Sequence, residues 1–378
     1  MSRVATFLRQ LPLSPDEIAS KSRLSTDRIR AFLDGDEDPT LADLRALSRG
    51  LRVPLRSFAS DSAAKSDLGM LFRQTVASRP DRGVEAAAGF VEAALKLLPP
   101  RDTPPQWLSQ FRFEQETYEE AERLANEFRQ MLLPGQLDEP LTELPRLIVG
   151  MGAILGRLET SRFEGASVVA DGYPFVFVSP RFAGRMLFTL AHEIGHLITH
   201  HKNSNRSVTF DLAGQIGGLN RHRTQAEHFV NAFASVLLLP AHGVGMFLQQ
   251  VRGTLGITNP AIGDIEILYL SRFYGVSFDV AARRCEDLQL LPSGGAKSLA
   301  DHLRVYFGGP EKRAEALRLP QRAPVHIPRV SKNLLSVAAE KVEQGEVSIG
   351  WVTDRLNCSI NDIYGARISG EGRRGPHH

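Results

Sequence analysis

Three short stretches with helical spacing of apolar residues occupy the first sixty residues. Ser14, followed by Pro15 and two acids, is typical of a helix start, and Ser25 marks a second start of the same kind. A third helix is expected after Thr40, with leucines on one face at positions 41, 44, 47 and 51. Two short helices joined by a tight turn and supported by a third are typical of a helix-turn-helix.

The second of these helices carries the residues with which a helix-turn-helix contacts DNA. Its outward side chains are predicted to be Thr26, Asp27, Arg28 and Arg30, and arginine there can contact guanine or phosphate. Positive charge is sparse, because residues 1–60 hold ten basic and eight acidic side chains. DNA binding is therefore one interpretation, and dimerisation or partner contact through the same fold is the other.

Residues 13–55 read LSPDEIASKSRLSTDRIRAFLDGDEDPTLADLRALSRGLRVPL. With its capped second helix, the glycine after that helix and the VPL ending, this stretch resembles the XRE (Cro/repressor-like) helix-turn-helix family. The resemblance implies a DNA-binding domain of a transcription regulator at the start of the chain.

Proline and glycine mark further boundaries. An Ala-rich helical pattern from Val84 to Leu98 ends at Pro99-Pro100, which cannot continue a helix, and a joint with the sequence SGGAKS follows at 293–298. We therefore expect a helix-turn-helix over 1–60, a helical linker over 61–105, a domain that carries the chemistry over 106–295 and a helical domain with a polar tail over 296–378.

The strongest chemical signal is the sequence His192-Glu193-Ile194-Gly195-His196. Histidines four residues apart lie on one face of a helix, so both imidazoles can bind one metal ion, with Glu193 beside them as a general base. The preceding residues GRMLFTL are apolar at helical spacing, which places the motif on a buried helix. These features predict a catalytic Zn²⁺ site.

A catalytic zinc needs a third protein ligand and an open position. Glu227, on a later helix that also presents Asn231, is the preferred donor, because a ligand set of two histidines and a carboxylate leaves zinc acidic enough to activate water. His200, one turn after His196, is the rival ligand. We expect His200 and Asn231 to lie beside the metal ligands or in the pocket wall.

Apolar runs upstream of the motif predict further core elements. Residues 168–178 read as two strands around Asp171-Gly172, and a strand next to the metal helix can bind an extended peptide by strand addition. The run LIVGMGAIL, residues 147–155, is too short to span a membrane and reads as a buried helix.

Four successive motifs resemble the ImmA/IrrE metallopeptidase family. They are GASVVADGYPFVFVSP, GRMLFTLAHEIGHLITHH, EHFVNAFASVLLLP and YLSRFYGVSFDVAARRCEDLQLL, and the similarity covers roughly residues 121–291. The resemblance implies a zincin-like domain in which His192, His196 and Glu227 bind zinc and Glu193 is catalytic. Members of this family resemble proteases that cleave XRE-type repressors and so switch on stress-response genes or mobile elements.

The C-terminal part is expected to be helical. Residues 334–342 follow an amphipathic helical pattern, and Ser348 and Ser359 are predicted caps of two further short helices. The turn between those two helices resembles a small helix-turn-helix, and a helical lid or a dimer contact is an equally good interpretation.

Composition limits the class of protein. The chain has 378 residues, 42% of them hydrophobic and 23% charged, with a formal net charge of +2, which is the balance of a globular protein. Two cysteines and no secretory start predict a cytoplasmic protein without membrane contact. We expect a mainly helical α+β chain that acts as a peptidase on a protein substrate. The alternatives are a transcription regulator whose metal domain senses a ligand without proteolysis, and a toxin–antitoxin or phage-defence component.

Overall fold

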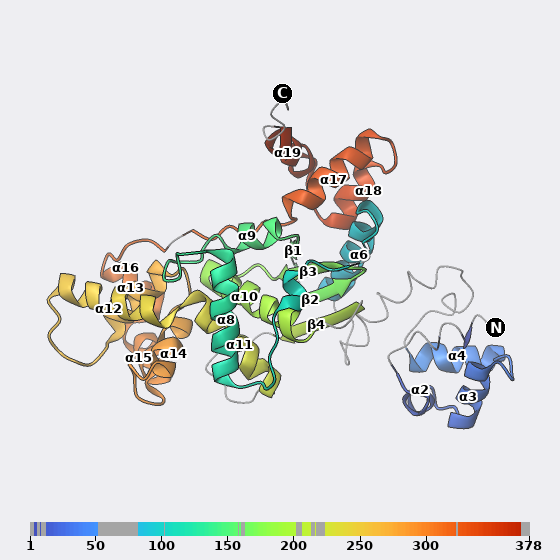
Figure 1. The fold of residues 1–378 in the computed structure, drawn as a ribbon, viewed down its shortest axis with the longest axis horizontal. Helices are drawn as coiled ribbons and strands as arrows, with labels where there is room; N and C mark the ends of the chain where they lie inside the picture. Colours follow the sequence, from blue (N-terminus) through green and yellow to red (C-terminus); the bar gives the residue numbers. More distant parts are fainter. Residues whose placement is uncertain are drawn as a thin grey trace. The chain divides into compact units, whose positions relative to one another are not determined.

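The computed structural model describes residues 4, 5, 8, 13–51, 82–101, 103–157, 159, 163–201, 206–212, 216, 224–322 and 324–371. The chain divides into two compact units, Met1–Glu92 and Ala93–His378 (Figure 1). The mainly helical α+β class is confirmed. Most of residues 1–12, residues 52–81, which include about half of the predicted linker, and residues 372–378 of the polar tail lie outside the described residues.

Within residues 13–51, three short helices pack around one apolar core. They are α2 (Pro15–Ser22), α3 (Thr26–Asp34) and α4 (Leu41–Gly50), and each begins where the sequence predicts. Ser14 and Thr40 form capping boxes, and Ser25 accepts a hydrogen bond from the backbone N–H of Arg28. The core comprises Val4, Leu8, Ile18, Ala19, Ile29, Phe32, Leu47 and Leu51. Helix α6 (Arg82–Leu97) runs across the boundary between the two units.

A four-stranded mixed sheet lies at the centre of the second unit. The strands are β1 (Ile154–Arg157), β2 (Phe163–Ala170), β3 (Tyr173–Val178) and β4 (Arg206–Leu212), in the order β1-β3-β2-β4. Strand β1 is parallel to β3, and the other pairs are antiparallel. Asp171 and Gly172 both have positive φ, 49° and 78°, and turn the predicted hairpin between β2 and β3.

The sheet corrects two predictions. The run 147–155 is not one helix, because α9 (Leu144–Gly150) ends at a tight turn and β1 begins at Ile154. The strand that leads into the metal helix, β3, has a neighbour on each side, so it offers no free edge for strand addition. Strand β4 is the outer strand on the other side of the hairpin.

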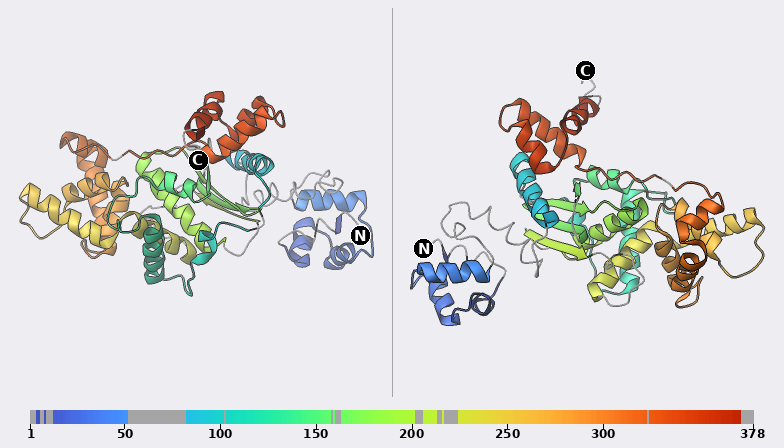
Figure 2. Two further views of the ribbon diagram at one scale, coloured as in Figure 1. Left: turned by 45° about the horizontal axis from the view of Figure 1, so that its top comes forward. Right: turned by 180° about the vertical axis from the view of Figure 1, so that it is seen from behind.

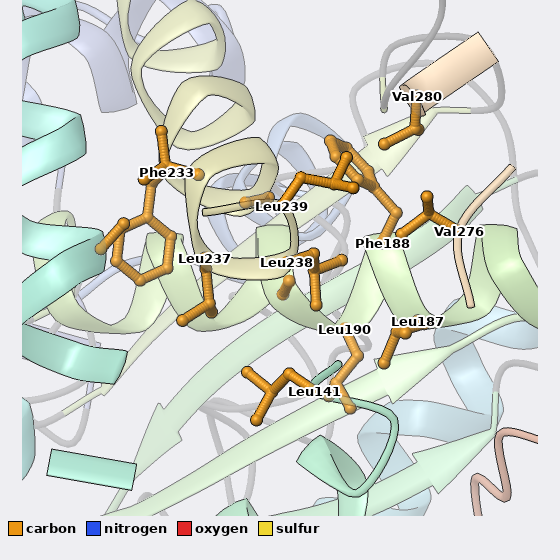
Figure 3. Close-up of a cluster of buried hydrophobic side chains, with 14 of the residues drawn as sticks. Leu141, Leu187, Phe188, Leu190, Phe233, Leu237, Leu238, Leu239, Val276 and Val280 are labelled. Carbon is orange, nitrogen blue, oxygen red and sulfur yellow. The ribbon is translucent and has the colours of Figure 1, made fainter. Parts of the chain in front are cut away.

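Three long helices build the core over the sheet (Figures 1 and 2). Helix α10 (Ala183–Thr199) packs on β2 and β3, α11 (Gln225–Leu238) packs on α10, and α8 (Tyr118–Leu132) packs on α11. Figure 3 shows part of this core, with Phe233, Leu237 and Leu238 of α11 and Leu187, Phe188 and Leu190 of α10 among its labelled side chains. This packing fixes the spacing between α10, α11 and the sheet.

Further helices extend the second unit. They are α7 (Trp107–Gln110), α12 (Ala241–Leu255), α13 (Asp264–Phe273), α14 (Phe278–Asp287), α15 (Gly295–Phe307) and α16 (Pro310–Ala316). No single helix in the described ranges combines the length and the apolar character of a membrane span. Helices α11 and α12 meet both criteria only when taken together, across a bend of 51°.

The C-terminal helices repeat the turn geometry of the N-terminal unit. They are α17 (Lys332–Glu343), α18 (Ile349–Leu356) and α19 (Ile360–Glu371). Asn357 ends α18 in the left-handed region and Ser359 caps α19, just as Arg23 ends α2 and Ser25 caps α3. Helices α2 and α18 are both eight residues long. At a constant offset of 334 residues, four buried positions also correspond: 18 with 352, 22 with 356, 29 with 363, and 32 with 366.

Candidate metal centre

The two motif histidines point to the same place from the buried face of α10. His192 and His196 are 0% and 2% exposed, and their Nε2 atoms lie 3.2 Å apart. Gly195 between them lets α11 approach, because a Cβ there would lie 3.1 Å from Phe233 Cδ1 and 3.2 Å from Val230 Cβ. The motif therefore supplies both the imidazoles and the close contact that brings the next helix to them.

Glu227 reaches the histidine pair from the first turn of α11. Thr224 caps this helix by accepting the backbone N–H of Glu227. The Glu227 carboxylate presents Oε2 to His192 Nε2 and Oε1 to His196 Nε2, each at 3.5 Å. The structure thus brings the preferred third donor to the pair.

A fourth donor, Asp211 on β4, joins the group. Its Oδ2 lies 3.4 Å from Nε2 of both His192 and His196, and the residue is 2% exposed. Sequence reasoning missed Asp211, because a single acid in RSVTFDL carries no spacing that relates it to the motif. The available signal was the alternation of Ser207, Thr209 and Asp211, which marks one polar face of a strand.

The spacing of the four donors fits a divalent metal such as zinc. Ligand atoms about 2.1 Å from a tetrahedral zinc are roughly 3.4 Å from one another. The distances given above between donor atoms are 3.2, 3.4, 3.4, 3.5 and 3.5 Å, and all four residues offer atoms within 4.8 Å of one another. Imidazole and carboxylate are also donors that zinc accepts.

The histidines and carboxylates of this group shift one another's pKa values. Burial lowers the pKa of His196, but hydrogen bonds with Asp211 and Glu227 outweigh it and raise that pKa to about 9. Burial raises the pKa of Glu227, and the two histidines more than reverse this, lowering it to about 2. The pKa of Asp211 is likewise held well below its usual value by the histidines, against the effect of burial. The centre is therefore a site where one buried carboxylate, Asp211, and one partly buried carboxylate, Glu227, favour a cation.

Glu193 lies on the sheet side of the same helix. It is 0% exposed, and burial is the main cause of a pKa raised well above the usual value, with the nearby Asp211 charge adding to it. Its carboxyl group packs against Gly165 of β2, where a Cβ would overlap it. Glu193 is therefore a buried acid close to the four donors, with a raised pKa whose main cause is burial.

Comparison with known proteins places this centre in a family context. Residues 156–286 match the family model of the IrrE N-terminal-like domain, Peptidase_M78. The matched segment contains His192, His196, Asp211, Glu227 and Glu193. It supports the ImmA/IrrE resemblance and gives the chain a domain similar to metallopeptidases. No curated protein matches the chain.

Two further predicted residues border the donors of the Peptidase_M78 segment. His200 Nδ1 lies 2.8 Å from His196 Nδ1, and its Nε2 lies 3.2 Å from Glu116 Oε1, so it contacts a candidate ligand from behind. Asn231 donates from Nδ2 to the backbone carbonyl of Glu227 at 2.6 Å. Neither belongs to the group of four donors.

A buried histidine that sequence reasoning passed over links α10 to β4. His201 is 2% exposed, and its Nε2 lies 3.2 Å from the hydroxyls of both Ser167 and Thr209, while Nδ1 contacts Ser207. Burial lowers the pKa of His201 to about 3, so the ring is neutral at pH 7. This contact anchors the strand that carries Asp211.

The predicted DNA-contact residues of α3 are not equally free. The Arg28 guanidinium donates from Nε and Nη2 to the two carboxylate oxygens of Asp43, at 3.0 and 2.9 Å. This bidentate pair occupies the groups that would contact a base. Asp27 and Arg30 are exposed, and Thr26 is partly exposed. Arg30 is thus a better candidate for a nucleic-acid contact than Arg28.

Proposed function

We propose that the chain is a zinc-dependent endopeptidase that regulates genes by cleaving a protein partner, an XRE-type repressor. The observation that carries the proposal is the set of four donors spaced for one zinc ion, three of them buried, with the buried acid Glu193 on the helix of the two histidines. The match of residues 156–286 to a peptidase family supports it. The repressor as substrate, and the resulting switch of stress-response or mobile-element genes, follow from the resemblance to ImmA/IrrE proteins.

Each residue of the centre has a defined task. His192, His196 and Glu227 hold the metal. When bound, zinc supplies Lewis acidity, which makes water a nucleophile at neutral pH and polarises a carbonyl. Glu193 takes a proton from the attacking water and returns it to the leaving amine, and its raised pKa suits this exchange. His200 fixes the orientation of the His196 ring.

We further propose that the N-terminal unit binds DNA through α3. Arg30 and Asp27 are exposed on this helix, whereas the Arg28 guanidinium is paired with Asp43. Such contacts would place the peptidase near a DNA-bound repressor. An exposed α3 together with a metal centre would also suit a transcription regulator that senses a ligand without proteolysis.

The test uses the full-length protein and XRE-type repressors from the same genome as substrates. Purified protein is expected to hold about one zinc per chain, and cleavage is followed by gel electrophoresis and mass spectrometry. Glu193→Gln should lower the cleavage rate by about 10²–10⁴-fold, because it removes the proton acceptor while keeping shape. Glu119→Gln, an exposed glutamate of α8, is the matched control and should leave the rate unchanged.

Two outcomes would overturn the proposed peptidase function. One is wild-type protein without zinc. The other is an E193Q variant that retains full regulatory output in cells while Arg30→Ala abolishes it; this second result would establish the regulator that works without proteolysis.

A further inference from the structure

Asp211 lies as close to the histidine pair as Glu227 does, and it comes from a different element. Its single atom Oδ2 is 3.4 Å from both Nε2 atoms, whereas Glu227 divides its two oxygens between them at 3.5 Å. The four donors therefore come from α10, β4 and α11. Asp211 occupies the position expected for a further tetrahedral ligand.

The strand holds Asp211 in this position. Asp211 is the Cα partner of Gly165 on β2, and Thr209, two residues earlier on the same face, lies 3.2 Å from His201 Nε2. Ser207 contacts the other nitrogen of the same ring. These contacts fix β4 to the end of α10. The backbone position of Asp211 therefore places its carboxylate next to the histidines.

The burial of Asp211 costs free energy unless its carboxylate has a positively charged partner. Asp211 is 2% exposed, and its carboxylate lies within 4.8 Å of the partly buried carboxylate of Glu227. Removing a second negative charge from water next to a first is unfavourable unless a cation compensates both. A divalent ion bound by all four residues would compensate both charges.

We propose that Asp211 is a fourth protein ligand, and that the resting chain holds its metal in a closed site which opens only when Asp211 withdraws. This inference rests on the proposed metal-dependent function and concerns the regulation of that same site. A catalytic zinc has three protein ligands and an open position, whereas four protein ligands are typical of a site without one. Displacement of the Asp211 carboxylate by a substrate carbonyl would then precede hydrolysis.

The first experiment measures zinc affinity in the full-length protein by competition with a chromophoric chelator. Asp211→Asn should weaken zinc binding by about 10-fold or more, since ligand and near-ligand changes cost at least this much. Asp171→Asn is the matched control, because Asp171 pairs with Arg206 of the same strand but lies outside the four donors. Equal affinity of wild type and D211N would overturn the inference.

The second experiment needs no variant. The visible spectrum of Co²⁺-loaded wild-type protein is recorded while acetohydroxamate, a small chelating ligand, is added. A closed site should leave the spectrum unchanged at concentrations that shift the spectrum of Co²⁺-loaded D211N. An immediate shift in wild type would show an open position and would overturn the inference even if D211N does not fold.

These outcomes are separable from failure of the peptidase. Wild-type protein that binds no metal refutes the proposed function. Wild-type protein that binds zinc with the same affinity as D211N, or that binds acetohydroxamate readily, refutes only the role of Asp211.

Discussion

The carboxyl group of Glu193 packs so closely on Gly165 that a Cβ at residue 165 would lie 2.8 Å from Glu193 Cδ. Gly165→Ala should therefore displace the proposed general base while leaving the metal donors in place. We expect cleavage to fall by about 10²-fold or more, with the zinc content unchanged and stability lower by about 1–3 kcal/mol.

Measurement of zinc content, cleavage rate and urea unfolding on one preparation tests this. Gly245→Ala is the control, because it is also a glycine-to-alanine change but has open space around it on α12. It should keep activity and, as a helix position, gain up to about 1 kcal/mol. Full activity in G165A would show that the contact between the Glu193 carboxyl group and Gly165 of β2 is not needed for catalysis.

Metal removal should destabilise the protein. A ligand that binds only the folded chain at 100 times its Kd adds about 2.7 kcal/mol to the free energy of unfolding. Thermal unfolding with and without added zinc should therefore show a shift of several degrees in Tm. His192→Ala should abolish the shift, whereas His228→Ala, exposed and beside Glu227 in sequence, should retain it. A shift that survives in H192A would place the metal elsewhere.

His201 should make stability depend on pH. Its pKa falls from an ordinary 6.5 to about 3 through burial, so the folded chain prefers the neutral ring. The corresponding stability is present above pH 6.5 and is lost as pH falls towards 3, at up to about 1.4 kcal/mol per pH unit. His201→Gln, which has no proton to gain, should flatten the curve of unfolding free energy against pH between 6 and 4.

Urea unfolding followed by circular dichroism gives that curve. His242→Gln is the control, because His242 is exposed and pairs with Asp138 at the surface. An H201Q curve parallel to wild type would contradict a neutral, buried His201.

Arg28 and Arg30 should act differently on DNA binding. Arg30→Ala should weaken binding and lower the slope of log affinity against log salt by about 1, if Arg30 contacts a phosphate. Arg28→Ala should act through folding, because it leaves the buried Asp43 carboxylate without its positively charged partner, with only the hydrogen bonds from Thr40. Gel-shift titrations at several salt concentrations, with unfolding curves for both variants, distinguish the two effects. Loss of affinity in R28A without loss of stability would restore Arg28 as a direct contact.

The sequence predicts those parts of the centre that local rules control. Spacing along one helix places His192 and His196 together. Glu227 is the carboxylate on the face of a later helix that also presents Asn231, and it completes a ligand set suited to catalytic zinc. The Asp-Gly turn between β2 and β3 is likewise a local signal. These elements needed no knowledge of the rest of the fold.

Long-range pairing explains what sequence reasoning missed. Asp211 reaches the histidines only because β4 pairs with β2, a strand more than forty residues earlier. The pairing of Arg28 with Asp43 also joins two helices, so an outward position on α3 became an internal contact. The end of α9 and the start of β1 depend on pairing with β3, which no apolar run of nine residues reveals.

The helix pairs α2–α3 and α18–α19 have the same turn geometry but different exposed side chains. At the offset of 334 residues, Thr26 corresponds to Ile360 and Arg30 to Tyr364. The C-terminal copy thus presents large apolar side chains, 52% and 43% exposed, where the N-terminal copy presents a hydroxyl and a positive charge. The two helix pairs therefore share a backbone turn but expose different side chains. If one pair were deleted, the other would not offer the same surface to a binding partner.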